Sequence, residues 1–495
     1  MTREQCIMLA ILVGYLALNM AAALWYGRRG NASGNAEKHY FIGSRGINGF
    51  MLAMTTMATY ISVSSFISGP GAAALTYGYA QTWVAAVQVP VTFLVLGVLG
   101  NKLALVSRRT GAVTVAGYLK ARYESDALVI VTSLLMVAFF IAQMVSQFTG
   151  GATLIHAITG LEYPASLAIF ASIVVIYTAF GGFRAVAITD AIQGLIMCAG
   201  TFLLLFFVLK AGGGLGGIDA GLKENLPGVY DHLFSRYRPG MLLSFWILVG
   251  FGTIGLPQTA VRGMSFKDTR SLHRAMIYGV LASTFVIVGM HLAGTWAGAL
   301  VDHGAELPTS DYFIPHIVQR IMPVGLAGLF LAAPMAAVMS TADSLLLLAA
   351  AAILRDLWKN YVVRDDPARL ARYQRLFPYA SIGTTLLLGI LTLLLALDPP
   401  DIIFFLNLFA LGGLECSFFW PLVGGLFWRK GNHLAAVVSA IGGAAVYVAS
   451  HFCIHWCGVH AVVWGLLASG LLYFAVGRLT CRSHPVSPES LDKCF

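Results

Sequence analysis

Residues 55–71, TTMATYISVSSFISGPG, lie inside an apolar segment long enough to span a bilayer, yet they form a poor continuous helix. Ser62, Ser64, Ser65 and Ser68 are packed together, and Gly69-Pro70-Gly71 follow at once. Proline removes a backbone donor and clashes with the preceding turn, while glycine relaxes the limits on φ and ψ. A carbonyl freed in hydrocarbon must be satisfied by protein, water or an ion, so such breaks are typical of transporter binding sites. A proline-kinked packing helix is the alternative that this stretch leaves open.

The composition is that of a membrane protein, because 58% of the 495 residues are hydrophobic and only 11% are charged. Since about 20 apolar residues cross a bilayer, windows of that length predict about 13 spans. They are expected near residues 6–26, 48–75, 80–104, 127–155, 165–181, 187–210, 241–262, 275–301, 321–352, 377–396, 402–428, 434–452 and 461–478. The first apolar run lacks the basic region and cleavage site of a signal peptide. We therefore expect an all-α integral membrane protein.

The net charge of +9 indicates topology rather than a nucleic-acid partner. If the N-terminus is outside, all but six of the 31 Lys and Arg residues fall in predicted inner loops. The six exceptions are Arg3, Lys210, Lys223, Arg236, Arg238 and Arg320. We expect a multi-pass protein of the cytoplasmic (inner) membrane, with the N-terminus outside and the C-terminus in the cytoplasm. The polar tail after Arg478 is predicted to be disordered.

The predicted span at 241–262 has the same features as the opening stretch. Gly250, Gly252 and Gly255 precede Pro257-Gln258-Thr259, so this segment is also interrupted. Two broken spans five helices apart are typical of an inverted repeat around a central site, with ordinary glycine-rich packing as the alternative. The expected single transporter domain divides into 1–47 (first span and inner loop), 48–210 (first repeat), 241–428 (second repeat), 429–478 (two peripheral spans) and 479–495 (cytoplasmic tail).

Polar side chains also interrupt the predicted span at 321–352. Ala337, Ser340, Thr341 and Ser344 are spaced to share one face of a helix. Hydroxyl and carbonyl oxygens suit a hard cation, although helix hydroxyls more often bond their own backbone. Asp343 is the stronger signal, because an ionisable residue inside a membrane span indicates function by default.

Other polar residues in spans have open interpretations. Asp190 starts a span, where it indicates either a functional carboxylate or a favourable interaction with the helix dipole. Glu415 is a further carboxylate inside an apolar run. Gln143 and Gln147 share a helix face that would line a cavity or, by default, form hydrogen bonds between helices.

Neither metal nor enzyme chemistry is indicated elsewhere. Cys453 and Cys457 cluster with His451, His455 and His460, but their spacing matches no standard zinc pattern. We expect a polar rim there rather than a metal site. The chain contains no HExxH, GxSxG or P-loop motif, so an enzyme is not expected.

Several of these motifs resemble the sodium:solute symporter family over about residues 40–428. The matching segments are YFIGSRG (40–46), ATYISVSSFISGPGAA (58–73), YTAFGGFRA (177–185), SFWILVGFGTIGLPQTAVR (244–262), GMHLAG (289–294), LAAPMAAVMST (331–341) and LNLFALGGLE (406–415). The family is similar in fold to the leucine transporter, a five-plus-five inverted repeat with broken helices that works by alternating access. Relatives in this family that act as membrane sensors carry a long cytoplasmic kinase extension. The tail of this sequence has no such extension, so a sensor is not expected.

The resemblance implies a substrate class and a sodium site. The segments at 58–73, 255–262 and 412–415 resemble members that carry pantothenate, so sodium-coupled pantothenate uptake is expected. Another small carboxylate or amino acid, such as acetate or proline, is the alternative substrate. The resemblance implies a sodium site between the first and eighth core helices. Its ligands would be the backbone carbonyls of Ala58, Ile61 and Ala337 and the hydroxyls of Ser340 and Thr341.

A second cation site and the substrate residues are less directly implied. Some family members bind a second sodium near the positions of Asp190, Ser340, Asp343 and Ser344. Asp343 stands where those members have a neutral side chain, so it could hold a cation, bind a proton or be a salt-bridged structural residue. The substrate residues expected from position are Tyr60, Ser64, Ser65, Gln147, Gln258, Thr259 and Glu415. The expected partners are pantothenate, sodium and the lipid bilayer, with no other cofactor and no obligatory protein partner.

Overall fold

The computed structural model describes residues 2–30, 47–226, 237–301, 307–364, 366–399, 403–453 and 458–495. These residues are almost entirely helical, and their one β-bridge joins Ile47 and Phe266. Eleven helices are long and apolar enough to cross a membrane, and two bent helix pairs raise the number to as many as 13. The expectation of an all-α membrane protein with about 13 spans is confirmed.

The first half of the chain contains six spans. They are formed by α1 (Arg3–Gly30); by α3 (Gly49–Tyr60) with η2 (Ser64–Ser68), α4 (Gly69–Ala72) and η3 (Ala73–Tyr77); by α5 (Tyr79–Ala86), α6 (Val91–Leu94), η4 (Val95–Gly100) and α7 (Asn101–Thr110); by α9 (Asp126–Thr159); and by the two parts of α10 (Tyr163–Ala211). The short helices α8 (Val115–Tyr123) and α11 (Gly214–Asn225) lie outside these spans. Gly182, at φ 67°, makes the turn inside α10 that separates its two spans.

The second half contains seven spans. They are formed by α12 (Pro239–Leu248), η5 (Phe251–Gly255) and α13 (Pro257–Gly263); by α14 (Thr269–Ser283), η6 (Thr284–Val288), α15 (Gly289–Ala297) and η7 (Gly298–Leu300); by α17 (Val324–Ala351) with η9 (Ala352–Val363); by α18 (Pro367–Ala396); by α19 (Ile403–Phe419), η10 (Trp420–Gly424) and α20 (Gly425–Phe427); by α21 (His433–Cys453); and by α22 (Ala461–Thr480). The short elements η8 (Ser310–Tyr312), α16 (Phe313–Ile321) and α23 (Pro488–Cys494) complete the chain.

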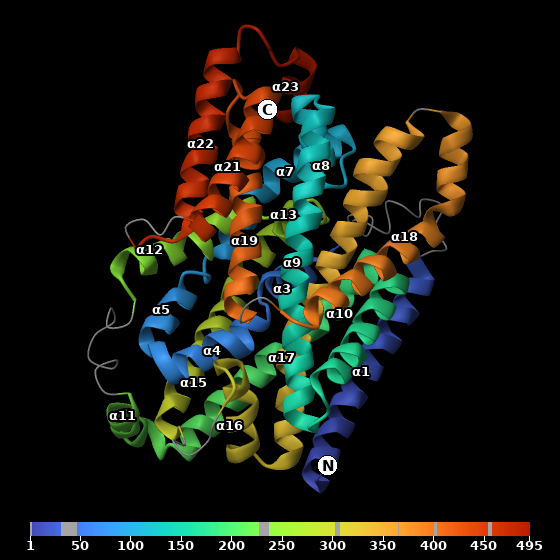
Figure 1. Ribbon diagram of the computed structural model, residues 1–495. Helices are drawn as coiled ribbons and strands as arrows, with labels where there is room; N and C mark the ends of the chain where they lie inside the picture. Colours follow the sequence, from blue (N-terminus) through green and yellow to red (C-terminus); the bar gives the residue numbers. More distant parts are fainter. Residues whose placement is uncertain are drawn as a thin grey trace.

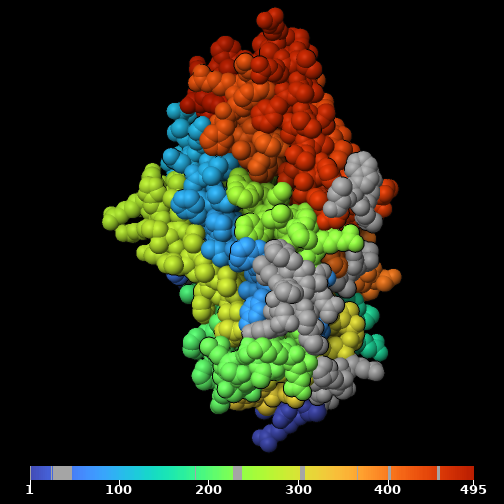
Figure 2. Space-filling view, turned by 90° about the vertical axis from the view of Figure 1, so that its left-hand side faces the viewer, coloured from blue at the N-terminus to red at the C-terminus, as the bar shows by residue number. Residues whose placement is uncertain are grey.

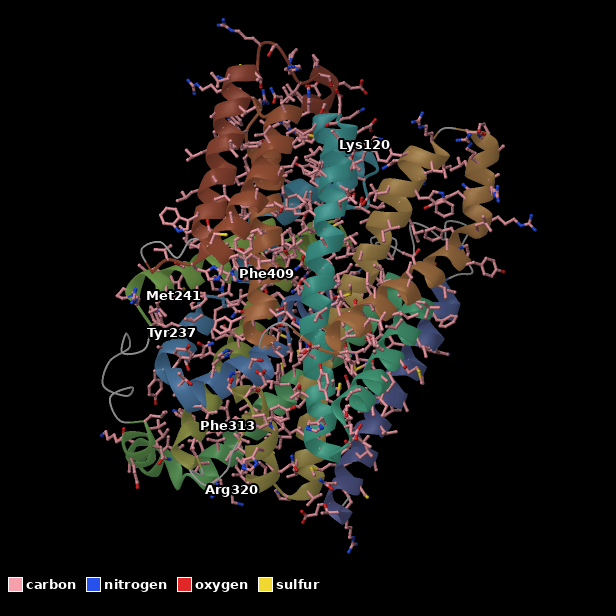
Figure 3. The ribbon with its side chains drawn as sticks, in the orientation of Figure 1. Lys120, Tyr237, Met241, Phe313, Arg320 and Phe409 are labelled. Atoms are coloured by element: carbon pink, nitrogen blue, oxygen red, sulfur yellow. The ribbon has the colours of Figure 1, made fainter. Side chains whose placement is uncertain are left out.

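The two termini lie at opposite ends of the helix bundle (Figure 1), as an odd number of spans requires. Lys120 lies near the end that carries the C-terminus, and Arg320 lies at the opposite end (Figure 3). This separation agrees with their prediction as inner and outer residues. The predicted inner-loop residues Lys38 and Arg45, with the motif at 40–46, lie outside the described residues.

Both predicted breaks are present. The axis bends by 75° between α3 and the segment Ser64–Tyr77, and by 47° between Pro239–Gly255 and α13. The first break lies at Ile61, which is extended at ψ 107°, inside the stretch 55–71 that was predicted to be interrupted. Pro70 lies inside the following helical segment, where Gly69 N–H donates five residues back to Ser64 in a wide turn that tolerates proline.

The glycines after the first break serve close packing. A Cβ atom on Gly71 would lie 2.1 Å from the carbonyl oxygen of Ser310, and one on Gly294 would lie 2.4 Å from that of Pro70. The segment therefore packs backbone against backbone, as small residues allow in membrane helices. Viewed from another side, the light-green segment around residues 239–263 lies below the red C-terminal helices (Figure 2), and α12 contacts α22.

The prediction of a disordered tail is wrong for the part that forms α23. Ser487 caps this helix by accepting a hydrogen bond from Ser490 N–H, and Pro488 occupies its first turn. The Ser490 hydroxyl donates to the carbonyls of Ala121 and Arg122, both at 2.9 Å. The polar composition of the tail did not indicate this helix, because α23 packs against α7 and α8, which are distant in the sequence.

We expect Gly71→Ala to lower the free energy of unfolding by about 1–3 kcal/mol, because the added methyl group overlaps the Ser310 backbone. Thermal unfolding of the detergent-solubilised protein measures the effect. Gly383→Ala in α18 is the matched control, since its Cβ meets nothing within 4 Å, and it should be neutral or stabilise by up to about 1 kcal/mol. Equal unfolding temperatures for the two variants would contradict the packing role of Gly71.

Candidate functional site

The end of α3 and the middle of α17 bring five oxygen atoms together. The Ser340 hydroxyl oxygen lies 3.0 Å from the Ala58 carbonyl oxygen and 3.2 Å from that of Ala337. The Thr341 hydroxyl oxygen lies 3.3 Å from the Ile61 carbonyl oxygen and 3.1 Å from that of Ala337. These are the five residues that the family resemblance implied as sodium ligands, and all of them are buried. Their role as ligands stays a prediction.

The break in α3 explains why these carbonyls are available. In a continuous helix, the Ile61 carbonyl would accept from Ser65 N–H. Here Ser65 N–H donates instead to the Ser62 carbonyl at 3.0 Å. The two hydroxyl groups of α17 carry only two protons for three carbonyl oxygens. The cluster is therefore rich in lone pairs, which is the chemistry of a site for a small hard cation.

A polar cavity of about 650 Å³, including its open mouth, lies beside the first break. The polar side chains that line it are those of Tyr60, Ser62, Ser64, Ser65, Gln81, Gln88, Gln143, Thr253, Gln258, His291 and Asn407. Both broken spans contribute to this lining, through Ser64 and Ser65 on one and Thr253 and Gln258 on the other.

A chain of amides connects the cavity to the break. The Gln147 side chain accepts a hydrogen bond from Val63 N–H at 3.2 Å, which satisfies a donor that the break leaves free. Asn407 accepts from Gln143 at 3.4 Å and from Gln147 at 3.3 Å. Gln143 therefore lines the cavity, and both Gln143 and Gln147 bond to Asn407 on another helix. Asn407 was missed, although a single amide in the apolar run 403–411 could have indicated it.

The cavity contains four of the seven side chains predicted for substrate: Tyr60, Ser64, Ser65 and Gln258. The other three are not among its lining residues. Gln147 lies behind Asn407, and the Thr259 hydroxyl donates to the Leu256 carbonyl at 2.9 Å. Glu415 is fully buried in α19. Position in a span could not distinguish the cavity face of a helix from its packing face.

A buried charged cluster lies on the α13 side of the first break. Arg262 pairs with Asp190 at 3.1 Å and donates to the Ser344 hydroxyl at 2.7 Å and to the Thr59 hydroxyl at 3.1 Å. The sequence indicated Arg262 only as an inner-loop charge, yet it is 2% exposed. This correction has a physical reason, because a buried guanidinium needs a carboxylate that only the fold can bring near.

Asp343 belongs to the same cluster, although among the described residues no ion pair joins it to Arg262. Its carboxylate accepts a hydrogen bond from the Tyr177 hydroxyl at 2.8 Å. One oxygen of Asp343 and one of Asp190 have no hydrogen-bond partner among the residues that the structure describes. The cluster therefore holds two buried carboxylates and one guanidinium, which pairs with Asp190, so it is short of one positive charge when both carboxylates are ionised.

The suggested rim of cysteine and histidine is only partly visible, because His455 and Cys457 lie outside the described residues. Within the described part of the chain, no group of three or more His, Cys, Asp or Glu residues is arranged to hold a metal ion.

The described fold and site define a class of protein: an all-α membrane protein with two broken helices around a polar cavity, as in transporters of the leucine-transporter fold. The profile of the sodium:solute symporter family matches residues 40–443. The chain belongs to this family.

Two curated relatives and one solved structure give the comparison detail. The sodium/pantothenate symporter of Escherichia coli K12 is 43% identical over 96% of this chain and 96% of its own. The sodium/pantothenate symporter of Haemophilus influenzae is 41% identical over 94% of this chain and 95% of its own. A solved Na⁺-coupled sialic acid symporter in a substrate-bound outward-open state has a TM-score of 0.78 at 19% identity, covering 96% of this chain and 98% of the other. That likeness shows the fold.

Proposed function

We propose that this protein imports pantothenate together with sodium across the cytoplasmic membrane by alternating access. The observation that carries the proposal is the cluster of five oxygen atoms from α3 and α17 directly beside the polar cavity. The pantothenate relatives at 43% and 41% identity support the choice of substrate. The N-terminus is then outside and the C-terminus in the cytoplasm, which the distribution of Lys and Arg supports. The two repeats are proposed as residues 48–210 and 241–428.

The break is the physical basis of coupling in this proposal. Sodium at Ala58, Ile61, Ala337, Ser340 and Thr341 would hold α3 against α17 and so stabilise one shape of the cavity. Binding of sodium and of substrate then favour each other by the same free energy. Each elementary charge that moves inward releases about 2.3 kcal/mol per 100 mV of membrane potential, which drives accumulation.

The cavity chemistry suits a small, flexible anion with hydroxyl and amide groups. Ser64 and Ser65 stand at the start of the helical segment Ser64–Tyr77, where the positive end of the helix dipole favours a carboxylate. Tyr60, Gln258 and Asn407 offer further donors and acceptors for amide and hydroxyl groups. We assign substrate contact to these five side chains, and a supporting role behind them to Gln147 and Thr259.

A second cation at Asp190, Asp343 and Ser344 is part of the proposal. Arg262 already neutralises Asp190, so the charge that remains to be balanced is that of Asp343. Its unpartnered oxygen and its position next to Ser344 in α17 support a cation there. The cation would be sodium or a proton.

Labelled pantothenate should accumulate in proteoliposomes when an inward sodium gradient is imposed, and should not when potassium replaces sodium. The sodium gradient supplies the driving force, so collapsing it must abolish accumulation. Uptake is measured by filtration at matched protein content. Unlabelled pantothenate should compete far better than acetate or proline. Equal competition by either would overturn the substrate assignment, and sodium-independent accumulation would overturn the coupling.

Ser340→Ala and Thr341→Ala should each raise the sodium concentration for half-maximal uptake roughly tenfold, as the loss of about 1.4 kcal/mol of binding would. Each variant removes one of five proposed ligands. The matched control is Thr392→Ala, whose hydroxyl donates only to the Leu388 carbonyl of its own helix at 2.8 Å. A sodium dependence unchanged in both variants would remove these hydroxyls from the site.

Asp343→Asn should lower the number of cations moved per pantothenate, because the neutral amide no longer requires a balancing charge. The ratio is obtained from the membrane potential at which net uptake reverses. Tyr177→Phe serves as the control, since it removes the hydrogen bond to Asp343 but leaves the carboxylate in place. An unaltered ratio in Asp343→Asn would assign Asp343 a structural role instead.

A further inference from the structure

Glu415 in α19 is a carboxyl group that the proposed transport mechanism does not use. It is fully buried, and neither carboxyl oxygen has a hydrogen-bond partner among the described residues. It is also absent from the lining of the polar cavity. An ionised carboxyl group in such a place is costly unless a positive charge or hydrogen-bond donors accompany it.

The carboxyl group lies against the second break, in the space that Gly252 leaves open. A Cβ atom on Gly252 would lie 2.0 Å from one carboxyl oxygen of Glu415 and 2.9 Å from the carbonyl oxygen of Ile247. Ile247 belongs to the last turn of α12, which ends at Leu248. Glu415 and the terminal carbonyls of α12 therefore face the same point.

The end of α12 is an unfavourable neighbour for a negative charge. The last carbonyls of a helix lack helical partners and carry about half a negative elementary charge between them. An ionised Glu415 would place a second negative charge beside them in a fully buried position. A protonated Glu415 could instead donate its hydrogen to one of these carbonyls, which satisfies both groups.

No cation from the described residues balances this carboxylate. The helices and turns packed against α19 include α9, α12, α21, α22, η2, η5 and η10. The titratable groups that interact with Glu415 are the Cys416 thiol on its own helix and the Tyr447 phenol on α21. The Tyr447 hydroxyl donates to the Phe409 carbonyl at 3.0 Å, so it is directed elsewhere. The described ion pairs do not include Glu415.

We propose that Glu415 is a proton-binding site, whose carboxylic acid stabilises the junction between α12 and η5, just before the second break, by donating to the carbonyls that end α12. Loss of the proton creates a negative charge against these carbonyls and weakens the contact between α19 and the break. Since η5 and Thr253 border the cavity, the proton state of Glu415 then controls the shape of the cavity wall. This site is separate from the sodium site at α3 and α17.

Infrared spectroscopy of the purified full-length protein tests the proton directly. A protonated carboxylic acid has a band distinct from that of a carboxylate. At neutral pH the wild type should show such a band, and Glu415→Gln should lose it. The matched control is Glu162→Gln, because Glu162 is exposed at the start of α10, far from any buried site. A wild-type spectrum without any protonated carboxyl band at neutral pH would overturn the proposal, whether or not the variant folds.

Thermal unfolding against pH gives a second readout that does not depend on transport. Ionised Glu415 becomes more frequent as the pH rises, so the unfolding temperature of the wild type should fall as the pH is raised. Glu415→Gln retains a neutral donor and should lose at least half of this fall, while Glu162→Gln should follow the wild type. Parallel pH curves for all three proteins would overturn the proposal. Both readouts remain valid even if pantothenate is not the substrate.

Discussion

The structure depends on backbone carbonyls that two breaks expose inside the membrane. In hydrocarbon such groups need partners, and water is not present to supply them. At the first break, hydroxyls of α17 meet the carbonyls of Ala58 and Ile61, and Gln147 accepts from Val63 N–H. These partners come from α17 and α9 and not from α3 itself. A segment that would be unstable alone therefore becomes the point at which three helices are held together.

The second break is satisfied in a different way. Thr253 and Thr259 donate their hydroxyls to carbonyls of the same segment, at 2.5 Å to Gly250 and 2.9 Å to Leu256. Glu415 fills the space beside Gly252. The two breaks thus present different chemistry to one cavity: neutral lone pairs suited to a cation at the first, and a carboxyl group next to a helix end at the second. The proposed pairing of a sodium site with a proton-binding site rests on this difference.

Electrostatics connects the breaks to the rest of the bundle. Arg262 lies on α13, directly after the second break, and it bonds to Asp190 on α10, Ser344 on α17 and Thr59 on α3. A buried ion pair of this kind adds little net stability, but separating it is costly. Movement of α13 must therefore break or carry this pair. Arg262 couples the position of the second broken helix to the helices that form the proposed sodium site.

The sequence by itself determined the membrane class, the number of spans and the existence of both breaks. The length of an apolar run determines whether it can span the membrane, and glycine and proline interrupt the helix. Both signals depend only on residues that are close together in the sequence. Family motifs also identified the five oxygen donors at α3 and α17. Only the tertiary structure decided that Asn407 faces the cavity while Glu415 does not, and that Arg262 is buried against Asp190. These outcomes depend on which helices pack against each other. Such contacts join residues far apart in the chain, so no local sequence pattern predicts them.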